Sequence, residues 1–254
     1  MFLLESFPIA KECFQIAQKL QTKNTKCVGV VQKLSSELIL GDCLEKMKEM
    51  PDNSVDFVLT DPPYNMGKEI ENDNLNRVDF KIFTLRYLNE IKRIVKPNRP
   101  VLIFFSTGES LADFISIAKD VLCFKKYINW YKPNDCSFPL NTVLRKSEAL
   151  LLFCKAKVLR YESDKNIHDC LIFNHKIKDR SFWHPTAKDL PLLNEIILAF
   201  SKKEDLVFDP FMGSGSVGVA SLKLLRNFIG IEIDQKYFDI AKKRIGDWEN
   251  QTRL

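Results

Sequence analysis

The sequence predicts an α/β fold of the doubly wound type, with a mainly parallel sheet and helices on both faces. Three observations support this prediction. Short apolar runs typical of buried strands alternate along the chain with segments of helical periodicity. A chain of 254 residues with 45% hydrophobic content is long enough to bury one large core. Turn-forming residues separate the segments, and no repeats interrupt them. We therefore expect one main α/β domain.

The individual elements follow from local patterns along the chain. Compact apolar runs bounded by turn residues predict strands over 37–40, 55–60, 100–106, about 124–131, 148–154, 205–209 and 227–233. Apolar residues at helical spacing predict helices over about 8–20, 43–50, 78–95, 109–121 and 190–200, one from 216, and a last one up to about 248. The polar stretch 65–77 is typical of a loop. We expect an N-terminal extension, residues 1–35, whose helix Ser6 would cap, and a main domain over 36–254.

Composition narrows the class of protein. No apolar run is long enough to cross a bilayer, and the first residues lack the basic flank of a signal peptide. We therefore expect a soluble, cytoplasmic protein without a membrane partner. The seven cysteines form no CxxC pair and are odd in number, which favours reduced thiols over disulfides or a zinc site. With only three histidines, no metal is expected.

Three strand ends carry residues suited to binding and chemistry. The sequence DPPY follows the strand over 55–60, so a carboxylate, a rigid backbone and an aromatic ring stand together at its carboxyl end. The sequence DPFMGSGSVG leads from the strand over 205–209 through close glycines into a helix, where backbone can approach a ligand. About twenty residues later the next strand ends in Glu232, whose carboxylate can accept both hydroxyls of a ribose. Together these ends indicate a nucleoside site, since ligands bind beyond the carboxyl ends of such sheets.

The order and spacing of these segments resemble a known family. DPPY followed far downstream by DPFMGSGS is similar to the amino-group DNA methyltransferases that use S-adenosylmethionine, specifically the permuted class, often called beta. The segments LILGDC, INWYKPN, SEALLLFCKAK, HPTAKDLPLLNEII and RNFIGIEID agree with it, and the likeness covers about residues 36–248. The resemblance implies a circularly permuted, Rossmann-like methyltransferase sheet with a short target-recognition insertion over 155–183 and S-adenosylmethionine as cofactor.

The catalytic segment has a chemical reason for its composition. The amine on a base is a weak nucleophile because its lone pair is delocalised into the ring. Asp61 can accept one amine hydrogen and the Pro62 carbonyl the other, which leaves the lone pair aimed at the methyl donor. Pro62 biases Asp61 toward an extended conformation, and Pro63 stiffens the turn. Tyr64 offers a flat face to a base that has left the duplex, with stacking worth about 1–3 kcal/mol.

The cofactor residues are implied by the resemblance. Asp209, Phe211, Gly213, Gly215 and Ser216 match the cofactor loop, and Glu232 matches the residue that holds the ribose. Asp42 matches a position near the adenine amine, and Asp61 also borders the cofactor. His184 and Thr186, with Pro185 between them, match the segment near the methionine end. The family commonly has Lys-Pro where this chain has Lys188 and Asp189, so Asp189 could instead cap the following helix.

Three functions remain open at this point. In the related families an aspartate at the head of DPPY usually accompanies adenine-N6 methylation, so a site-specific DNA adenine-N6 methyltransferase is the first. The second is another amino-group methyltransferase, acting on cytosine N4, on RNA or on a protein glutamine. The third is a relative that binds DNA without catalysis, against which the intact motif residues argue.

The target-recognition segment over 155–183 is short and basic. It holds seven Lys or Arg against four acids. Its expected partner is double-stranded DNA, contacted mostly at phosphates by six of these residues: Lys155, Lys157, Arg160, Lys176, Lys178 and Arg180. Because 29 residues supply few base contacts, we expect a homodimer that shares a DNA-facing surface. A restriction endonuclease of the same system is a further possible partner.

Overall fold

The computed structural model describes residues 34–64, 75–106, 109–134, 146–161, 163–174 and 188–251. The strands are β1 (Ser36–Leu40), β2 (Phe57–Thr60), β3 (Pro100–Phe105), β4 (Cys123–Tyr131), β5 (Ser147–Cys154), β6 (Cys170–Ile172), β7 (Leu206–Asp209) and β8 (Asn227–Glu232). The helices are α2 (Cys43–Lys48), α3 (Arg77–Ile94), α4 (Glu109–Val121), α5 (Leu190–Phe200), α6 (Ser216–Lys223) and α7 (Gln235–Gln251). The expected helix over 8–20 and most of the expected loop over 65–77 lie outside the described residues.

The described strands form one sheet in the order β1-β8-β7-β2-β3-β5-β4-β6. The first five strands in this order run parallel. Strand β5 runs antiparallel to both β3 and β4, while β6 pairs with β4 in parallel. Since no helix is described between β4 and β5, an antiparallel pair is the arrangement that needs no crossover helix. The predicted doubly wound, mainly parallel fold is therefore confirmed, with one antiparallel strand.

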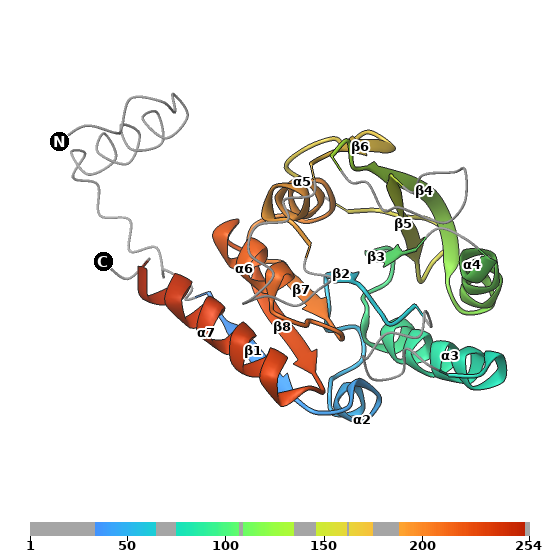
Figure 1. Ribbon diagram of the computed structural model, residues 1–254, viewed down its shortest axis with the longest axis horizontal. Coiled ribbons are helices and arrows are strands. Elements are labelled where there is room, and N and C mark those ends of the chain that lie inside the picture. Colours follow the sequence, from blue (N-terminus) through green and yellow to red (C-terminus); the bar gives the residue numbers. More distant parts are fainter. Residues whose placement is uncertain are drawn as a thin grey trace. The chain divides into compact units, whose positions relative to one another are not determined.

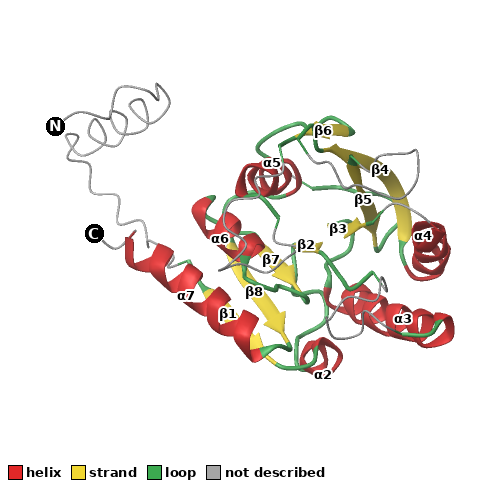
Figure 2. Ribbon diagram, in the orientation of Figure 1, coloured by secondary structure: helices red, strands yellow, loops and turns green. Residues whose placement is uncertain are grey.

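Helices cover both faces of the sheet (Figure 1, Figure 2). Helices α2, α3 and α4 bury their apolar sides on one face, and α5, α6 and α7 on the other. Strand β2 shows why, because its alternate residues belong to different cores: Val58 to the first, and Phe57 and Leu59 to the second. All three side chains are fully buried. This double burial explains why the strand is a continuous apolar run.

Most expected elements match the observed ones within two residues, but one strand was missed. Strand β6 has three residues, Cys170–Ile172, and only Leu171 among them is buried. A run this short carries no periodicity from which a strand could be predicted. It lies inside the expected target-recognition segment, 155–183, so part of that segment forms the outermost strand of the sheet, next to β4.

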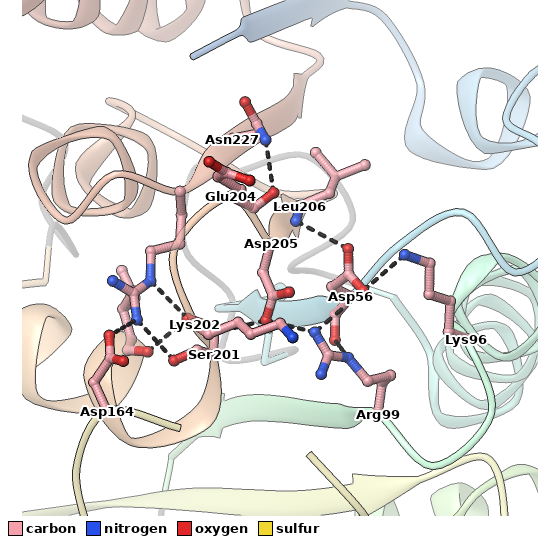
Figure 3. Close-up of polar contacts among 12 residues, drawn as sticks. Asp56, Lys96, Arg99, Asp164, Ser201, Lys202, Glu204, Asp205, Leu206 and Asn227 are labelled. Atoms are coloured by element: carbon pink, nitrogen blue, oxygen red, sulfur yellow. Dashed lines mark hydrogen bonds and ion pairs between the residues drawn. The ribbon is translucent and has the colours of Figure 1, made fainter. Parts of the chain in front are cut away.

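The edge of the sheet where β2, β3, β7 and β8 begin, here called the amino edge, is fastened by charged side chains (Figure 3). Asp56 pairs with Lys96 at 2.7 Å and with Arg99 at 3.1 Å, and it accepts the Leu206 N–H. Arg99 also pairs with Asp205 at 2.5 Å. These buried or half-buried groups compensate one another, which gives them a structural role. The opposite edge, here called the carboxyl edge, is where the candidate site lies.

Candidate active site

Four acidic residues end or follow four adjacent strands at the carboxyl edge. Neighbouring parallel strands end side by side, so the sheet order β1-β8-β7-β2 sets these residues in a row. In that order they are Asp42, Glu232, Asp209 and Asp61. The sequence predicted all four as site residues. The structure thus brings the DPPY segment and the glycine loop, which lie far apart in the chain, to one edge of the sheet.

The DPPY segment leaves β2 with its aromatic ring turned into the protein. The Tyr64 ring is only 8% exposed and lies 4.9 Å from the Phe105 ring, measured between centroids. Pro62 is buried and Pro63 is partly exposed. Asp61 keeps 17% of its side chain exposed. Its Oδ1 atom is nonetheless buried, so a base could reach this oxygen and stack on Tyr64 only after neighbouring groups move.

Lys188 contacts this segment from outside it. Its ammonium Nζ lies 2.6 Å from Asp61 Oδ2 and 3.1 Å from Glu148 Oε2. Glu148 Oε1 in turn accepts a hydrogen bond from Lys132 Nζ at 2.9 Å. No site role was predicted for Lys188, Glu148 or Lys132. The available signal was that all three lie in segments that resemble the family, and that Lys188 stands where the family also has lysine.

Opposite charges set the protonation of this buried cluster. Burial would lower the pKa of Lys188, but the Asp61 and Glu148 carboxylates outweigh it and hold that pKa above its ordinary value. Burial would raise the pKa of Glu148, but Lys188 and Lys132 lower it to about 2. At neutral pH both groups are charged, so the cluster is an alternating series of cations and anions.

Asp209 links strand β2 to the glycine loop. Its Oδ1 accepts the Thr60 hydroxyl at 2.7 Å and the Phe211 N–H at 3.1 Å. Burial raises the pKa of Asp209 to about 7, with further contributions from the Asp61 and Glu232 charges, while the two hydrogen bonds act against the rise. This carboxyl group is therefore a poorly solvated, structural member of the site.

The glycine loop has the backbone that a close approach requires. Gly213 and Gly215 have φ angles of 52° and 75°, in the left-handed region that side chains disfavour. A Cβ added at Gly215 would lie 3.0 Å from the Ala241 Cβ of α7. Helix α7 also supplies Arg244, whose Nη1 donates to Ser214 O at 2.5 Å, to Ser214 Oγ at 2.9 Å and to Ser216 Oγ at 3.2 Å.

Arg244 was not predicted from the sequence, because nothing in a helical pattern marks which surface arginine reaches a distant loop. Burial lowers the pKa of Arg244 to about 10, so the guanidinium remains charged at neutral pH. Its contacts fix the turn between the two glycines to α7.

Glu232 closes the glycine loop from the next strand. Its Oε2 accepts the Gly213 N–H at 2.8 Å and its Oε1 accepts the Asp234 N–H at 2.9 Å. A carboxylate has about four acceptor sites, so the group retains capacity for a ribose hydroxyl beside these backbone partners. Burial raises the pKa of Glu232. Beside it, Leu40 and Ile233 are 39% and 43% exposed, and such apolar surface suits the flat face of a purine. The sequence analysis missed these two residues.

Asp42 and Phe211 have structural contacts in addition to their predicted roles. Asp42 caps α2, since its Oδ1 accepts the Leu44 N–H at 2.6 Å. Phe211 packs edge-on against Tyr87 of α3, with ring centroids 5.3 Å apart. Asp189 occupies the N-cap position of α5 as expected, but without a side-chain capping hydrogen bond. Of the remaining predicted cofactor residues, His184 and Thr186, with Pro185 between them, lie outside the described residues.

The predicted DNA-binding residues divide into two groups. Lys155, Lys157 and Arg160 follow β5, which ends at the amino edge, opposite Asp61. There Lys155 Nζ donates to Asn53 Oδ1 at 2.6 Å, and the Arg160 N–H donates to Asn98 O at 2.9 Å. The structure therefore does not bring this group together with Asp61. The second group, Lys176, Lys178 and Arg180, lies outside the described residues.

Within the described ranges, no three His, Cys, Asp or Glu side chains gather as a metal site would require. No helix in the same ranges has the length and apolar character to span a membrane.

Several known proteins are similar to this chain in sequence, in fold or in both. The model of a protein family described as DNA methylase matches residues 55–243. The type II methyltransferase M.HinfI of Haemophilus influenzae is 30% identical over 244 residues, which cover 82% of this chain and 67% of that protein. The PvuII DNA methyltransferase, described as cytosine-N4-specific, has a similar fold, with a TM-score of 0.72 and 18% identity over 85% of this chain and 92% of that chain. The M1.HpyAVI–SAM complex gives a TM-score of 0.64 and 28% identity over 83% and 98% of the two chains.

Proposed function

This chain belongs to the DNA methylase family, and from that premise we propose that it methylates the N6 amine of adenine in double-stranded DNA, with S-adenosylmethionine as methyl donor. It is a DNA methyltransferase with a Rossmann-like methyltransferase fold. The proposal of adenine-N6 methylation rests on the position of Asp61. This carboxylate stands at the end of β2, beside β7 and its glycine loop, where a target amine and a methyl donor could meet.

The residues of the DPPY segment would act on the target amine. Asp61 accepts one amine hydrogen and the Pro62 carbonyl accepts the other, so the nitrogen lone pair points away from both. The amine loses a proton when its nitrogen is methylated, and the Asp61 carboxylate is placed to receive it. Tyr64 stacks on the extruded base once its face becomes accessible.

The residues of the glycine loop fit S-adenosylmethionine. When bound, this cofactor supplies a methyl group activated by a sulfonium sulfur. Gly213 and Gly215 leave the backbone unobstructed, Glu232 retains acceptor capacity for the ribose, and Asp42 borders the same edge. We assign Phe211 and Ser216 to the loop, and His184 and Thr186 to the methionine end, from the resemblance. The catalytic segment precedes this loop in the chain, which supports the permuted class.

The choice of adenine rests on Asp61 at the head of DPPY, and cytosine N4 is the alternative. The test incubates the protein with methyl-labelled cofactor and long unmethylated bacterial genomic DNA, then digests the DNA and separates the nucleosides. Label in N6-methyldeoxyadenosine supports the proposal. Label only in N4-methyldeoxycytidine would overturn the adenine assignment and keep the reaction class. No label in either nucleoside would contradict both.

We also propose a homodimer that shares a DNA-facing surface, and a restriction endonuclease as partner in the same system. Support for the dimer is the short recognition segment, which offers few base contacts from one subunit. Light scattering at the concentration of the activity assay tests it, and a sharp monomer mass would refute it. Sequencing the methylated DNA with a modification-sensitive method would give the recognition sequence, and with it the restriction activity to look for.

A further inference from the structure

Four charged side chains from four separate segments form a continuous series that ends at the carboxylate of Asp61. Lys132 follows β4, Glu148 belongs to β5, Lys188 precedes α5 and Asp61 follows β2. Successive members are joined at 2.9 Å, 3.1 Å and 2.6 Å, and cations alternate with anions. The two lysine side chains are each only 7% exposed. Burying two ammonium groups is unfavourable unless each is paired, so this arrangement has a reason beyond chance packing.

The ammonium of Lys188 lies among the groups that a target amine would use. It contacts Asp61 Oδ2, the proposed amine acceptor, at 2.6 Å. It also lies 5.9 Å from the centroid of the Tyr64 ring, the proposed stacking face, and 4.9 Å from that of Phe104. A carboxylate and aromatic faces attract a cation for the same electrostatic reasons that they attract the hydrogens of an amine. Lys188 therefore occupies a position that the amine of the substrate would also favour.

Glu148 gives Lys188 a second partner when the amine arrives. Its Oε2 is 3.1 Å from the ammonium, and its other oxygen is held by Lys132. A small movement of Lys188 toward Glu148 would release Asp61 and expose the face of Tyr64 without leaving the ammonium unpaired. Because its pKa lies above the ordinary value, Lys188 stays protonated and cannot itself accept the proton of the amine. Its contribution is electrostatic.

We propose that Lys188 is a positioning residue for methyl transfer, which keeps Asp61 ionised and oriented before the base arrives and then withdraws onto Glu148. This inference rests on the proposed role of Asp61. Among the described residues, Lys188 contacts Asp61, and the charge of Asp61 acts on Asp209. Tyr64 belongs to the same segment as Asp61, and Glu148 and Lys132 lie behind Lys188. Asp209 disfavours the ionised form of Asp61, and Lys188 opposes this effect.

The test compares three variants with the wild type and a matched control. Lys188→Met removes the charge but keeps an unbranched side chain, Lys188→Arg keeps the charge, and Glu148→Gln removes the second partner. The control is Lys48→Met, which breaks the exposed pair with Glu45 on α2. Methyl transfer to long unmethylated genomic DNA is measured across neutral and mildly acidic pH, giving kcat and KM separately. Calorimetry with S-adenosylmethionine and thermal melting report whether each variant is folded.

Changes at Lys188 and at Glu148 should alter different kinetic constants. Lys188→Met should lower kcat about 100-fold and move the acidic limb of its pH profile to higher pH, because Asp61 loses its cation. Lys188→Arg should recover at least about tenfold of that loss, because the positive charge returns. Glu148→Gln should instead raise KM for DNA with no upward shift of the acidic limb, because Lys188 then holds Asp61 alone. Cofactor affinity should stay within about twofold, a change too small to signal a lost contact.

Each outcome decides between this inference and its alternatives. If the ion series only stabilises the fold, all three variants lower the melting temperature without moving the pH profile, and the inference is wrong. An equal rate in the Met and Arg variants would also overturn it. If Lys188→Met does not fold, Lys188→Arg and Glu148→Gln still decide, since a Glu148→Gln protein with unchanged KM for DNA contradicts the withdrawal. A wild type that fails to methylate any DNA would instead overturn the proposed function.

Discussion

The hydroxyl of Thr60 donates a hydrogen bond to Asp209 over 2.7 Å, across 149 residues of sequence. This contact joins the last residue of β2 to the last residue of β7. Asp61 and Pro210 follow these two residues directly, so the bond fixes the spacing of the DPPY segment from the glycine loop. Asp209 is 2% exposed, which makes its ionisation unfavourable and ties the stability of the protein to pH.

We predict that Asp209→Asn changes how stability depends on pH. Burial raises the pKa of Asp209 to about 7. Below its unfolded pKa, near ~4, the group is protonated in both states and its stabilising contribution is complete. As the pH rises toward about 7, the unfolded state releases the proton first, so the contribution is lost. Asparagine has no such proton. Relative to wild type, the free energy of unfolding of the variant should therefore rise by up to ~1.4 kcal/mol per pH unit over this window.

Urea unfolding at several pH values measures this difference as the free energy of unfolding. The control is Asp120→Asn, because Asp120 is exposed on α4 and its removal should leave the pH dependence unchanged. Parallel curves for wild type and Asp209→Asn would show that folding does not raise the pKa of Asp209.

The sequence allowed the sheet and the two motifs to be predicted for a physical reason. Strands such as β2 and β3 are buried on both faces, so they appear as unbroken apolar runs, and the DPPY and glycine segments follow directly from strand ends. Partners that come from remote parts of the chain were not predictable. Lys188 reaches Asp61 across 127 residues, and Arg244 reaches Ser214 across 30. Local patterns encode which face of a helix is buried, but not which single side chain meets a distant loop.

We predict that Asp61→Ala lowers methyl transfer by at least about 100-fold while S-adenosylmethionine binding stays nearly intact, because this carboxylate acts on the target amine. The glycine loop, which is the main proposed cofactor site, follows a different strand. A labelled-methyl assay gives the rate and calorimetric titration gives the affinity. Substantial turnover by the variant would remove Asp61 from the mechanism, and a lost affinity would move it to the cofactor site.

We predict that Gly213→Val abolishes cofactor binding. Gly213 has a φ of 52°, and a branched residue there is strained by about 1–2 kcal/mol in addition to obstructing the ligand. The control is Gly246→Ala in α7, where an added Cβ meets no atom within 4 Å. That variant should bind the cofactor normally and gain up to about 1 kcal/mol of helix stability. Unchanged calorimetric affinity in a folded Gly213→Val protein would contradict the placement of the site.

We predict that Arg244→Met weakens S-adenosylmethionine binding about tenfold, because hydrogen bonds to a charged group are worth about 1.5–3 kcal/mol and here hold the glycine loop. DNA binding in the absence of cofactor should not change. Lys243→Met is the matched control, since Lys243 is the adjacent cation of α7 and is exposed. Equal affinities in the two variants, both measured by calorimetry, would show that the loop keeps its shape without Arg244.

The last prediction concerns which part of the basic segment 155–183 faces DNA. Lys155 is hydrogen-bonded to Asn53 at the amino edge, which is opposite the edge where Asp61 lies. By contrast, the chain leaves β6 beside the end of β4, where the Phe173 N–H donates to Tyr131 O, and Lys188 already contacts Asp61. The described residues on either side of 175–187 therefore both lie toward the carboxyl edge, whereas Lys155 does not.

We expect charge reversal of Lys176 and Lys178 to weaken binding to all DNA sequences and to flatten its salt dependence. Each phosphate contact releases a counterion and adds about 0.9 to the slope of log affinity against log salt concentration. Charge reversal of Lys155 and Lys157 changes the net charge equally, so it controls for long-range attraction and should have the smaller effect. Fluorescence anisotropy with duplex DNA at several salt concentrations compares the two double variants. Equal losses would show that net charge, and not contact by Lys176 and Lys178, causes the effect, and no loss in either would show that this segment does not contact DNA.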